Sequence, residues 1–100
     1  MPFSVRITRA AAVDLVAVRA WLTQPGAGRA AADRLRRIRT AIRELRLDPT
    51  RWPRGEHEGT RARSVAGHRI VYRVRQGSGP GVGEVDVLRV FGPGQSRGDG

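Results

Sequence analysis

The chain has 100 residues and carries 19 basic residues, all of them arginine, against 9 acidic ones, so its formal net charge is +10. This length allows one domain with one modest core, and the absence of cysteine excludes disulfides, thiolate metal sites and a cysteine nucleophile. Two histidines cannot build a zinc site alone, no stretch is apolar over the length of a membrane span, and residues 1–9 have no signal-peptide core. We therefore expect no metal, no cofactor, no membrane association and a cytoplasmic location.

The N-terminal part of the chain predicts a short strand and a first helix. Apolar and polar residues alternate over residues 3–7, which is typical of a half-buried strand. Thr8 can cap a helix that begins near Arg9, and the Gln-Pro-Gly run at residues 24–26 ends it. One apolar face of this helix is formed by Ala11, Leu15, Val18 and Leu22.

The next segment predicts a second helix, from Gly28 to Leu47. Its apolar residues at helical spacing are Ala31, Leu35, Ile38, Ile42 and Leu45. Asp48-Pro49 ends it, and the short break before it favours an antiparallel helical hairpin. A second face of the same helix is basic and carries Arg36, Arg39, Arg43 and Arg46. A solvated basic face is the simplest interpretation of that spacing, and a partner-binding face is the alternative.

The C-terminal half predicts a loop over residues 50–59 and then an antiparallel sheet. The expected strands are Arg61–Val65, His68–Arg75 and Glu84–Phe91, joined by a tight turn at residues 66–67 and a glycine-rich loop at 76–83. The fold class is therefore α+β in the order β-α-α-β-β-β. The N-terminal strand and the helical hairpin pack on one face of a mostly antiparallel sheet. We expect one domain over residues 1–91 and a flexible tail over 92–100.

Alternation of side chains along the last two strands assigns their two faces. The residues assigned to the core under the helices are Ile70, Tyr72, Val74, Leu88 and Val90. The residues assigned to the open face are Arg69, Val71, Arg73, Val87, Arg89 and Phe91. A face that mixes arginine with apolar residues is either a binding surface or an ordinary solvated face whose aliphatic residues favour the strand.

Several segments taken together resemble the RelE/ParE toxin superfamily. They are Val5-Arg6-Ile7-Thr8, Ala11, Asp14-Leu15, Trp21-Leu22, Gly59-Thr60-Arg61, residues 67–74 and residues 87–91. The resemblance runs from about Val5 to Arg97 and keeps the order of the elements. It implies the toxin of a type II toxin–antitoxin module. A cognate antitoxin, ParD-like or similar, would neutralise this toxin through an acidic or amphipathic segment in a hetero-oligomer.

The superfamily contains two chemistries, and the residues favour one of them. RelE-like members cut mRNA on the ribosome, whereas ParE-like members act on DNA gyrase and stabilise its cleaved complex with DNA. The chain has no lysine and no tyrosine or histidine after Tyr72, and arginine cannot act as a general acid or base near neutral pH. We therefore expect a ParE-like toxin without catalytic residues. The alternative is an mRNA endonuclease that uses Arg63, His68, Arg73 and Arg89. A basic nucleic-acid-binding module explains the charge but not the order of the elements.

Two contact surfaces are expected. Contacts with gyrase, and with the DNA bound to it, are assigned to Arg69, Arg73, Arg89, Phe91, Gln95 and Arg97. Contacts with the antitoxin are assigned to Leu35, Arg36, Arg39, Arg43, Val71 and Val87. The antitoxin would occupy a groove bordered by residues 27–39 and 69–75.

Overall fold

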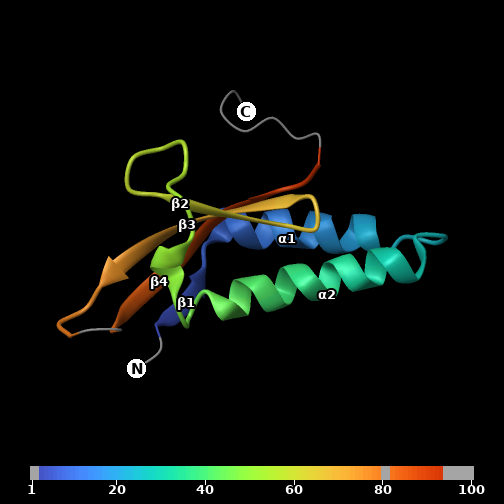
Figure 1. Ribbon diagram of the computed structural model, residues 1–100. Helices are drawn as coiled ribbons and strands as arrows, with labels where there is room; N and C mark the ends of the chain where they lie inside the picture. The colour runs from blue at the N-terminus through green and yellow to red at the C-terminus, as the bar shows by residue number, and fades with distance from the viewer. Residues whose placement is uncertain (1–2, 80–81, 94–100) are drawn as a thin grey trace.

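The computed structural model describes residues 3–79 and 82–93, and the elements follow one another as the sequence predicts (Figure 1). They are β1 (Ser4–Ile7), α1 (Arg9–Leu22), α2 (Gly28–Glu44), the 3₁₀ turn η1 (Pro49–Arg51), β2 (Arg61–Val65), β3 (His68–Gln76) and β4 (Gly83–Phe91). The four strands form one sheet in the order β1-β4-β3-β2. β1 runs parallel to β4 and the other pairs are antiparallel, so the predicted α+β architecture is confirmed.

The N-cap of α1 also joins the helix to the sheet. The Thr8 hydroxyl accepts a hydrogen bond from the Ala11 amide at 3.3 Å and donates to the Val87 carbonyl at 2.8 Å. One threonine therefore fixes both the start of α1 and the position of that start beside β4.

The second helix ends earlier than its apolar pattern predicts. α2 stops at Glu44, and the amides of Leu45 and Arg46 bond to carbonyls only three residues back, those of Ile42 and Arg43. These tighter bonds close the last turn of the helix, so residues 45–47 lie outside it.

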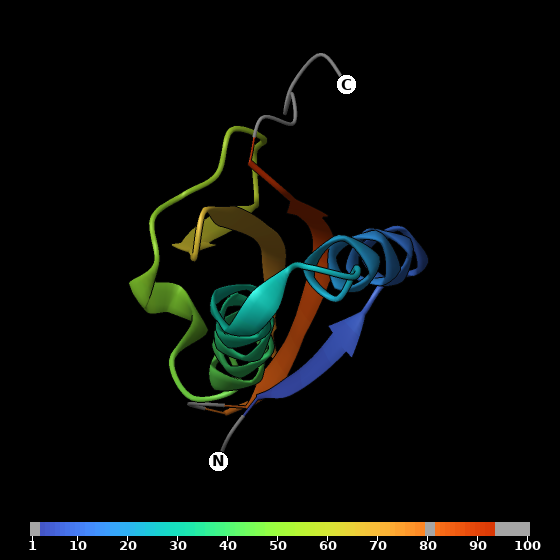
Figure 2. The same ribbon diagram turned by 90° about the vertical axis from the view of Figure 1, so that its right-hand side faces the viewer.

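The two helices lie side by side, and α2 occupies the hollow of the curved sheet while α1 follows β4 (Figure 2). The largest fully buried side chains between them are those of Tyr72, Ile38, Leu45, Ile70, Val85, Val87 and Val90. Burial raises the pKa of the Tyr72 hydroxyl to about 12, and this hydroxyl donates a hydrogen bond to the Pro49 carbonyl. A neutral tyrosine thus ties η1 to the middle of the sheet.

A β-bulge in β4 overturns part of the predicted face assignment. Tyr72 pairs with Val87 and Val71 pairs with Arg89, so Leu88 is an extra residue in β4. The core side of the strand therefore changes parity, from Val85 and Val87 to Val90. The predictions that Leu88 belongs to the core and that Val87 lies on the open face are wrong, since Val87 is fully buried and Leu88 is only half-buried.

The ends of the chain are described only in part. Of the expected tail, Gly92 and Pro93 are described, whereas residues 94–100, and with them Gln95 and Arg97, lie outside the described residues. Within residues 3–79 and 82–93, neither helix has the length and apolar character that crossing a bilayer requires.

Candidate functional site

The side of the sheet away from the helices, here called the outer face, carries a network of arginines and carboxylates. The Arg75 guanidinium contacts Glu84 and lies 2.9 Å from Asp86, and the Arg6 guanidinium lies 3.5 Å from Asp86 on the other side. The hydrogen bond from Arg75 holds the pKa of the Asp86 carboxyl below its usual range, and the same bond raises the pKa of Arg75. Arg73 lies opposite Asp86 in the register of β3 and β4.

A second ion pair joins the outer face to α1. The two oxygens of Asp14 accept hydrogen bonds from the Arg89 guanidinium at 2.8 and 3.1 Å, and one of them also accepts from the Val90 amide at 2.8 Å. β1 pairs with β4 only as far as Val87. Beyond that point no described strand pairs with this edge of β4, so Asp14 accepts the hydrogen bond from the amide instead. The bond to Asp14 raises the pKa of Arg89, whose guanidinium stacks 4.9 Å above the Phe91 ring.

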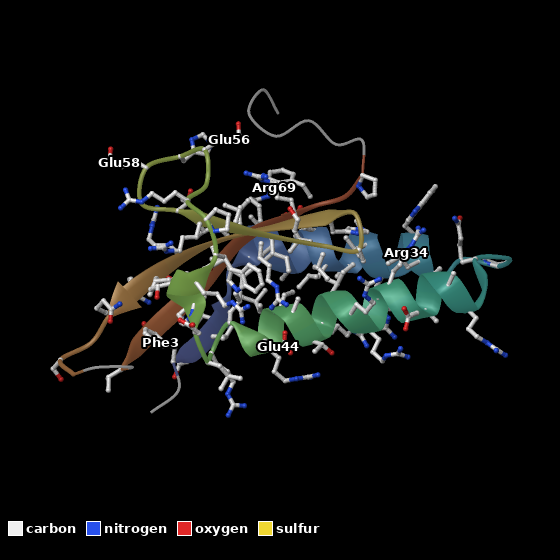
Figure 3. All side chains as sticks on the ribbon, in the orientation of Figure 1. Phe3, Arg34, Glu44, Glu56, Glu58 and Arg69 are labelled. Atoms are coloured by element: carbon white, nitrogen blue, oxygen red, sulfur yellow. The ribbon has the colours of Figure 1, made fainter. Side chains whose placement is uncertain are left out.

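A further arginine of this side, Arg69, is paired more loosely. Arg69 lies 4.0 Å from Glu56 of the loop before β2, and both side chains are seen on the side of the molecule away from α2 (Figure 3). The outer face is therefore basic in sequence but largely neutralised by carboxylates of the same chain.

An apolar groove lies between the two helices. It has a volume of about 320 Å³ and is lined by Ile7, Leu15, Val16, Arg19, Leu35, Arg39 and Ile42. Val16 is 70% exposed and Ile7 is 42% exposed, which is unusual for large apolar side chains on a small domain. Arginines from both helices thus stand beside an uncovered apolar surface.

Comparison with known proteins identifies the family. The sequence model described as the ParE toxin of the type II toxin–antitoxin system, parDE, matches residues 5–93. The chain belongs to this family. It is therefore a toxin of the ParE/RelE superfamily of type II toxin–antitoxin systems. No curated protein matches the chain significantly.

Solved structures share the fold of this ParE-family toxin. The chain is similar to a structure of the chromosomal ParDE system from P. aeruginosa, with a TM-score of 0.71 and 21% identity over 91% of this chain and 96% of that one. It is also similar to the RelBE2 complex from Mycobacterium tuberculosis, with a TM-score of 0.61 and 22% identity over 95% of both chains. It is similar as well to a YoeB/ParE toxin from Agrobacterium tumefaciens, with a TM-score of 0.60 and 23% identity over 89% of this chain and 97% of that one. At these identities the likeness shows the fold alone.

The residues considered for catalysis are divided between the two sides of the sheet. Arg73 and Arg89 lie on the outer face, whereas Arg63 faces α2, where its guanidinium is 2.9 Å from the Ala41 carbonyl and 3.0 Å from Glu44. His68 is 4% exposed, and its Nδ1 lies 3.0 Å from the Ala66 carbonyl. The toxin therefore does not gather these four residues at one point.

The residues expected to contact the antitoxin also lie on different surfaces. Leu35 and Arg39 line the groove between the helices, while Arg36 and Arg43 are exposed on α2 beside it. Val71 lies on the outer face, opposite Arg89, and Val87 is in the core. The expected groove bordered by residues 69–75 is corrected: the groove lies between α1 and α2, and no residue of β3 lines it.

Sequence reasoning missed the contribution of α1 to both surfaces. Val13 and Val16 lie off the apolar stripe that packs on the sheet, and both are more than 60% exposed. A valine on the solvent side of a helix is a signal for a covered surface, and Val16, unlike Val13, lines the groove. Asp14 gave no comparable signal, since its partner Arg89 is 75 residues away.

Proposed function

We propose that this ParE-family toxin acts on DNA gyrase, stabilising its cleaved complex with DNA in the cytoplasm, and that a cognate antitoxin neutralises it in a hetero-oligomer. The family match over residues 5–93 carries the proposal. The contacts with gyrase and its DNA are assigned to the outer face, around Arg73, with Arg69, Arg89 and Phe91 beside it.

The groups that could move a proton favour this target over the ribosome. Among the described residues, His68 is buried against a backbone carbonyl, Tyr72 is buried with a pKa raised to about 12, and the exposed His57 lies on the loop before β2 rather than on the sheet. Arginine stays charged near neutral pH, so Arg73 and Arg89 can stabilise negative charge but cannot act as general base. A toxin that acts by binding a protein–DNA complex does not need such a base.

The groove between α1 and α2 is the proposed site of the antitoxin. Apolar side chains such as Leu15, Val16 and Leu35 line it, and Arg19 and Arg39 stand among them. This arrangement suits an amphipathic segment with apolar residues on one side and carboxylates on the other. Exposed Arg36 and Arg43 extend the positive charge along the same helix.

The target is tested with purified gyrase and plasmid DNA. We expect the toxin to leave linear plasmid after gyrase is denatured, and Arg73→Glu to reduce the linear product, because the change reverses the charge of an exposed outer-face arginine. Arg37→Glu on α2 is the matched control, with the same charge change on another exposed side chain. Cleaved mRNA with translating ribosomes, together with intact plasmid, would establish the endonuclease alternative instead.

The antitoxin site is tested with two valines of one helix. Val16→Asp places a carboxylate in the groove, so we expect it to weaken antitoxin binding and to leave toxicity unchanged. Val13→Asp is the control, since Val13 is 63% exposed on α1 but does not line the groove. Equal binding of the antitoxin to both variants would show that its site lies outside the groove between α1 and α2.

A further inference from the structure

The polar pocket between η1, the loop before β2 and the end of β3 has no role in the proposed function. It has a volume of about 280 Å³ and is lined by Thr50, Arg54, Gly59, Thr60, Arg61, Val74 and Gln76. This volume is near the lower end of the range of about 300–1,000 Å³ that is usual for small-molecule sites. The pocket lies on the helix side of the sheet, as Arg61 shares a face with buried Tyr72.

Two arginines of the pocket are held next to each other by the backbone. Arg54 and Arg61 form an isolated antiparallel bridge, so their side chains are direct cross-strand neighbours. Like charges in that position destabilise the pair. Neither forms an ion pair within residues 3–79 and 82–93, and the Arg61 guanidinium is positioned by a 2.7 Å hydrogen bond to the Trp52 carbonyl.

Backbone hydrogen bonds close the frame around the two arginines. The Ala62 amide donates to the Pro53 carbonyl at 3.0 Å, and the Gly55 amide donates to the Thr60 carbonyl at 2.8 Å. A Cβ on Gly55 would lie 2.5 Å from the Thr60 hydroxyl oxygen, so this close approach requires glycine. The two arms of the loop therefore hold the arginines together despite their repulsion.

The acidic residues nearby do not neutralise the pair. No carboxylate of residues 3–79 or 82–93 lines the pocket. Glu56 and Glu58 lie at the outer bend of the loop (Figure 3), and Glu56 lies 4.0 Å from Arg69 of β3 rather than in the pocket. Asp48 is close enough to act on Tyr72, but it is not among the lining residues. The pocket thus combines two adjacent positive charges with the polar side chains of Thr50 and Gln76.

We propose that this pocket binds a phosphate group through Arg54 and Arg61. Guanidinium groups form bidentate hydrogen bonds to phosphate oxygens, and a bound phosphate replaces the repulsion between the two arginines by two attractions. The Thr50 hydroxyl and the Gln76 amide are further donors at the rim. The phosphate belongs either to a small phosphate monoester or to the diester backbone of a nucleic acid. The inference does not depend on gyrase as the target.

The test compares Arg54→Gln with Arg37→Gln in the full chain, with inorganic pyrophosphate as the probe at a constant ionic strength of about 0.15 M. We expect Arg54→Gln to bind pyrophosphate about tenfold more weakly, because it loses charge-assisted hydrogen bonds. In phosphate-free buffer its Tm should equal or exceed that of the unmodified chain, because the repulsion is relieved. Arg37→Gln should change neither quantity. Arg61→Gln is the secondary variant, since it also removes the bond to Trp52.

Two further results decide the inference and the source of the phosphate. Equal weakening in Arg54→Gln and Arg37→Gln, or no weakening in Arg54→Gln, overturns the proposal, because binding would then reflect the net charge alone. A dinucleotide with a 5′ phosphate that binds, while its 5′-hydroxyl form does not, supports the site with a monoester as its ligand. Equal binding of both forms, sensitive to Arg54→Gln, supports the site with the diester as its ligand.

Discussion

The outer face of the sheet and the surface of α2 both carry arginine, but they differ in what those arginines already contact. On the outer face Arg6, Arg75 and Arg89 each form ion pairs with carboxylates from other elements or strands. Among the six arginines of α2, only Arg36 forms an ion pair in the described part of the chain, with Asp33 one turn away. The positive charge that remains for a partner is therefore concentrated on α2.

The number of arginines on the outer face therefore overstates how strongly that face attracts a phosphate or a carboxylate of a partner. A guanidinium that is already hydrogen-bonded to a carboxylate must give up that bond before it can contact phosphate or another carboxylate. Arg73 is the exception on the outer face. It lies opposite Asp86 in the neighbouring strand, but the two form no ion pair among the described residues. This makes Arg73 the first residue to change when the target surface is tested.

The largest effect on the free energy of unfolding is expected at Asp14. Asp14→Ala removes the partner of Arg89 and leaves the Val90 amide without an acceptor, so we expect the free energy of unfolding to fall by about 2–3 kcal/mol. Asp33→Ala on α2 removes only an exposed ion pair and should cost less than about 0.5 kcal/mol. Urea unfolding of both variants measures the two values. Similar losses would show that the pairing on the outer face contributes no more than an ordinary surface ion pair.

A smaller effect is expected at the centre of the outer face. Asp86→Asn should lower the free energy of unfolding by about 1 kcal/mol at neutral pH, since the side chains of its arginine partners are 46% and 62% exposed. The pKa of Asp86 is depressed in the folded state, so its contribution is present above the unfolded value of about 3.9 and is lost as pH falls through the folded value. The difference between the two proteins should therefore shrink below about pH 4. A difference that does not change between neutral and acid pH would contradict this assignment.

The smallest effect on stability is expected on α2 itself. Replacing Arg29, Arg34 and Arg43 together with glutamine should leave the free energy of unfolding within about 0.5 kcal/mol, because all three are exposed and none forms an ion pair in the described part of the chain. Each arginine that contacts a phosphate should lower the salt dependence of duplex DNA binding by about 0.9 in the log–log slope. The matched control replaces Arg6, Arg69 and Arg75, which are paired on the outer face. A larger change of slope in the control would show that the arginines of the outer face contribute more to DNA binding than those of α2.

The elements of the fold could be predicted because each one leaves a local pattern. The apolar spacing of α2 and the alternation in β3 appear within single windows of sequence, as does the turn at residues 66–67. The bulge at Leu88 could not be predicted in this way, because alternation assumes an unbroken register and a bulge depends on how β4 pairs with β3. One extra residue was enough to exchange the places of Val87 and Leu88.

The candidate surfaces could be predicted less well, because they depend on partners far apart in the chain. The pairing of Asp14 with Arg89 and the bridge between Arg54 and Arg61 follow from tertiary structure and from loop geometry. The groove between the helices needed the position of Ile7 at the end of β1 as well as the helical pattern. Charge and composition indicated that the chain binds a partner, but they did not indicate which face binds it.

The parallel pairing of β1 with β4 has a consequence for the synthesis of this toxin. Val5 pairs with Val85, and Thr8 bonds to the Val87 carbonyl, so among the strands that the structure describes β1 has β4 as its only hydrogen-bonded neighbour. Contacts of such long sequence separation close late during folding. A chain still attached to the ribosome has released residues 4–7 long before residues 84–87 are available to them. The complete sheet can therefore form only after β4 has left the ribosome, so the chain lacks its full sheet throughout the synthesis of the residues that separate the two strands.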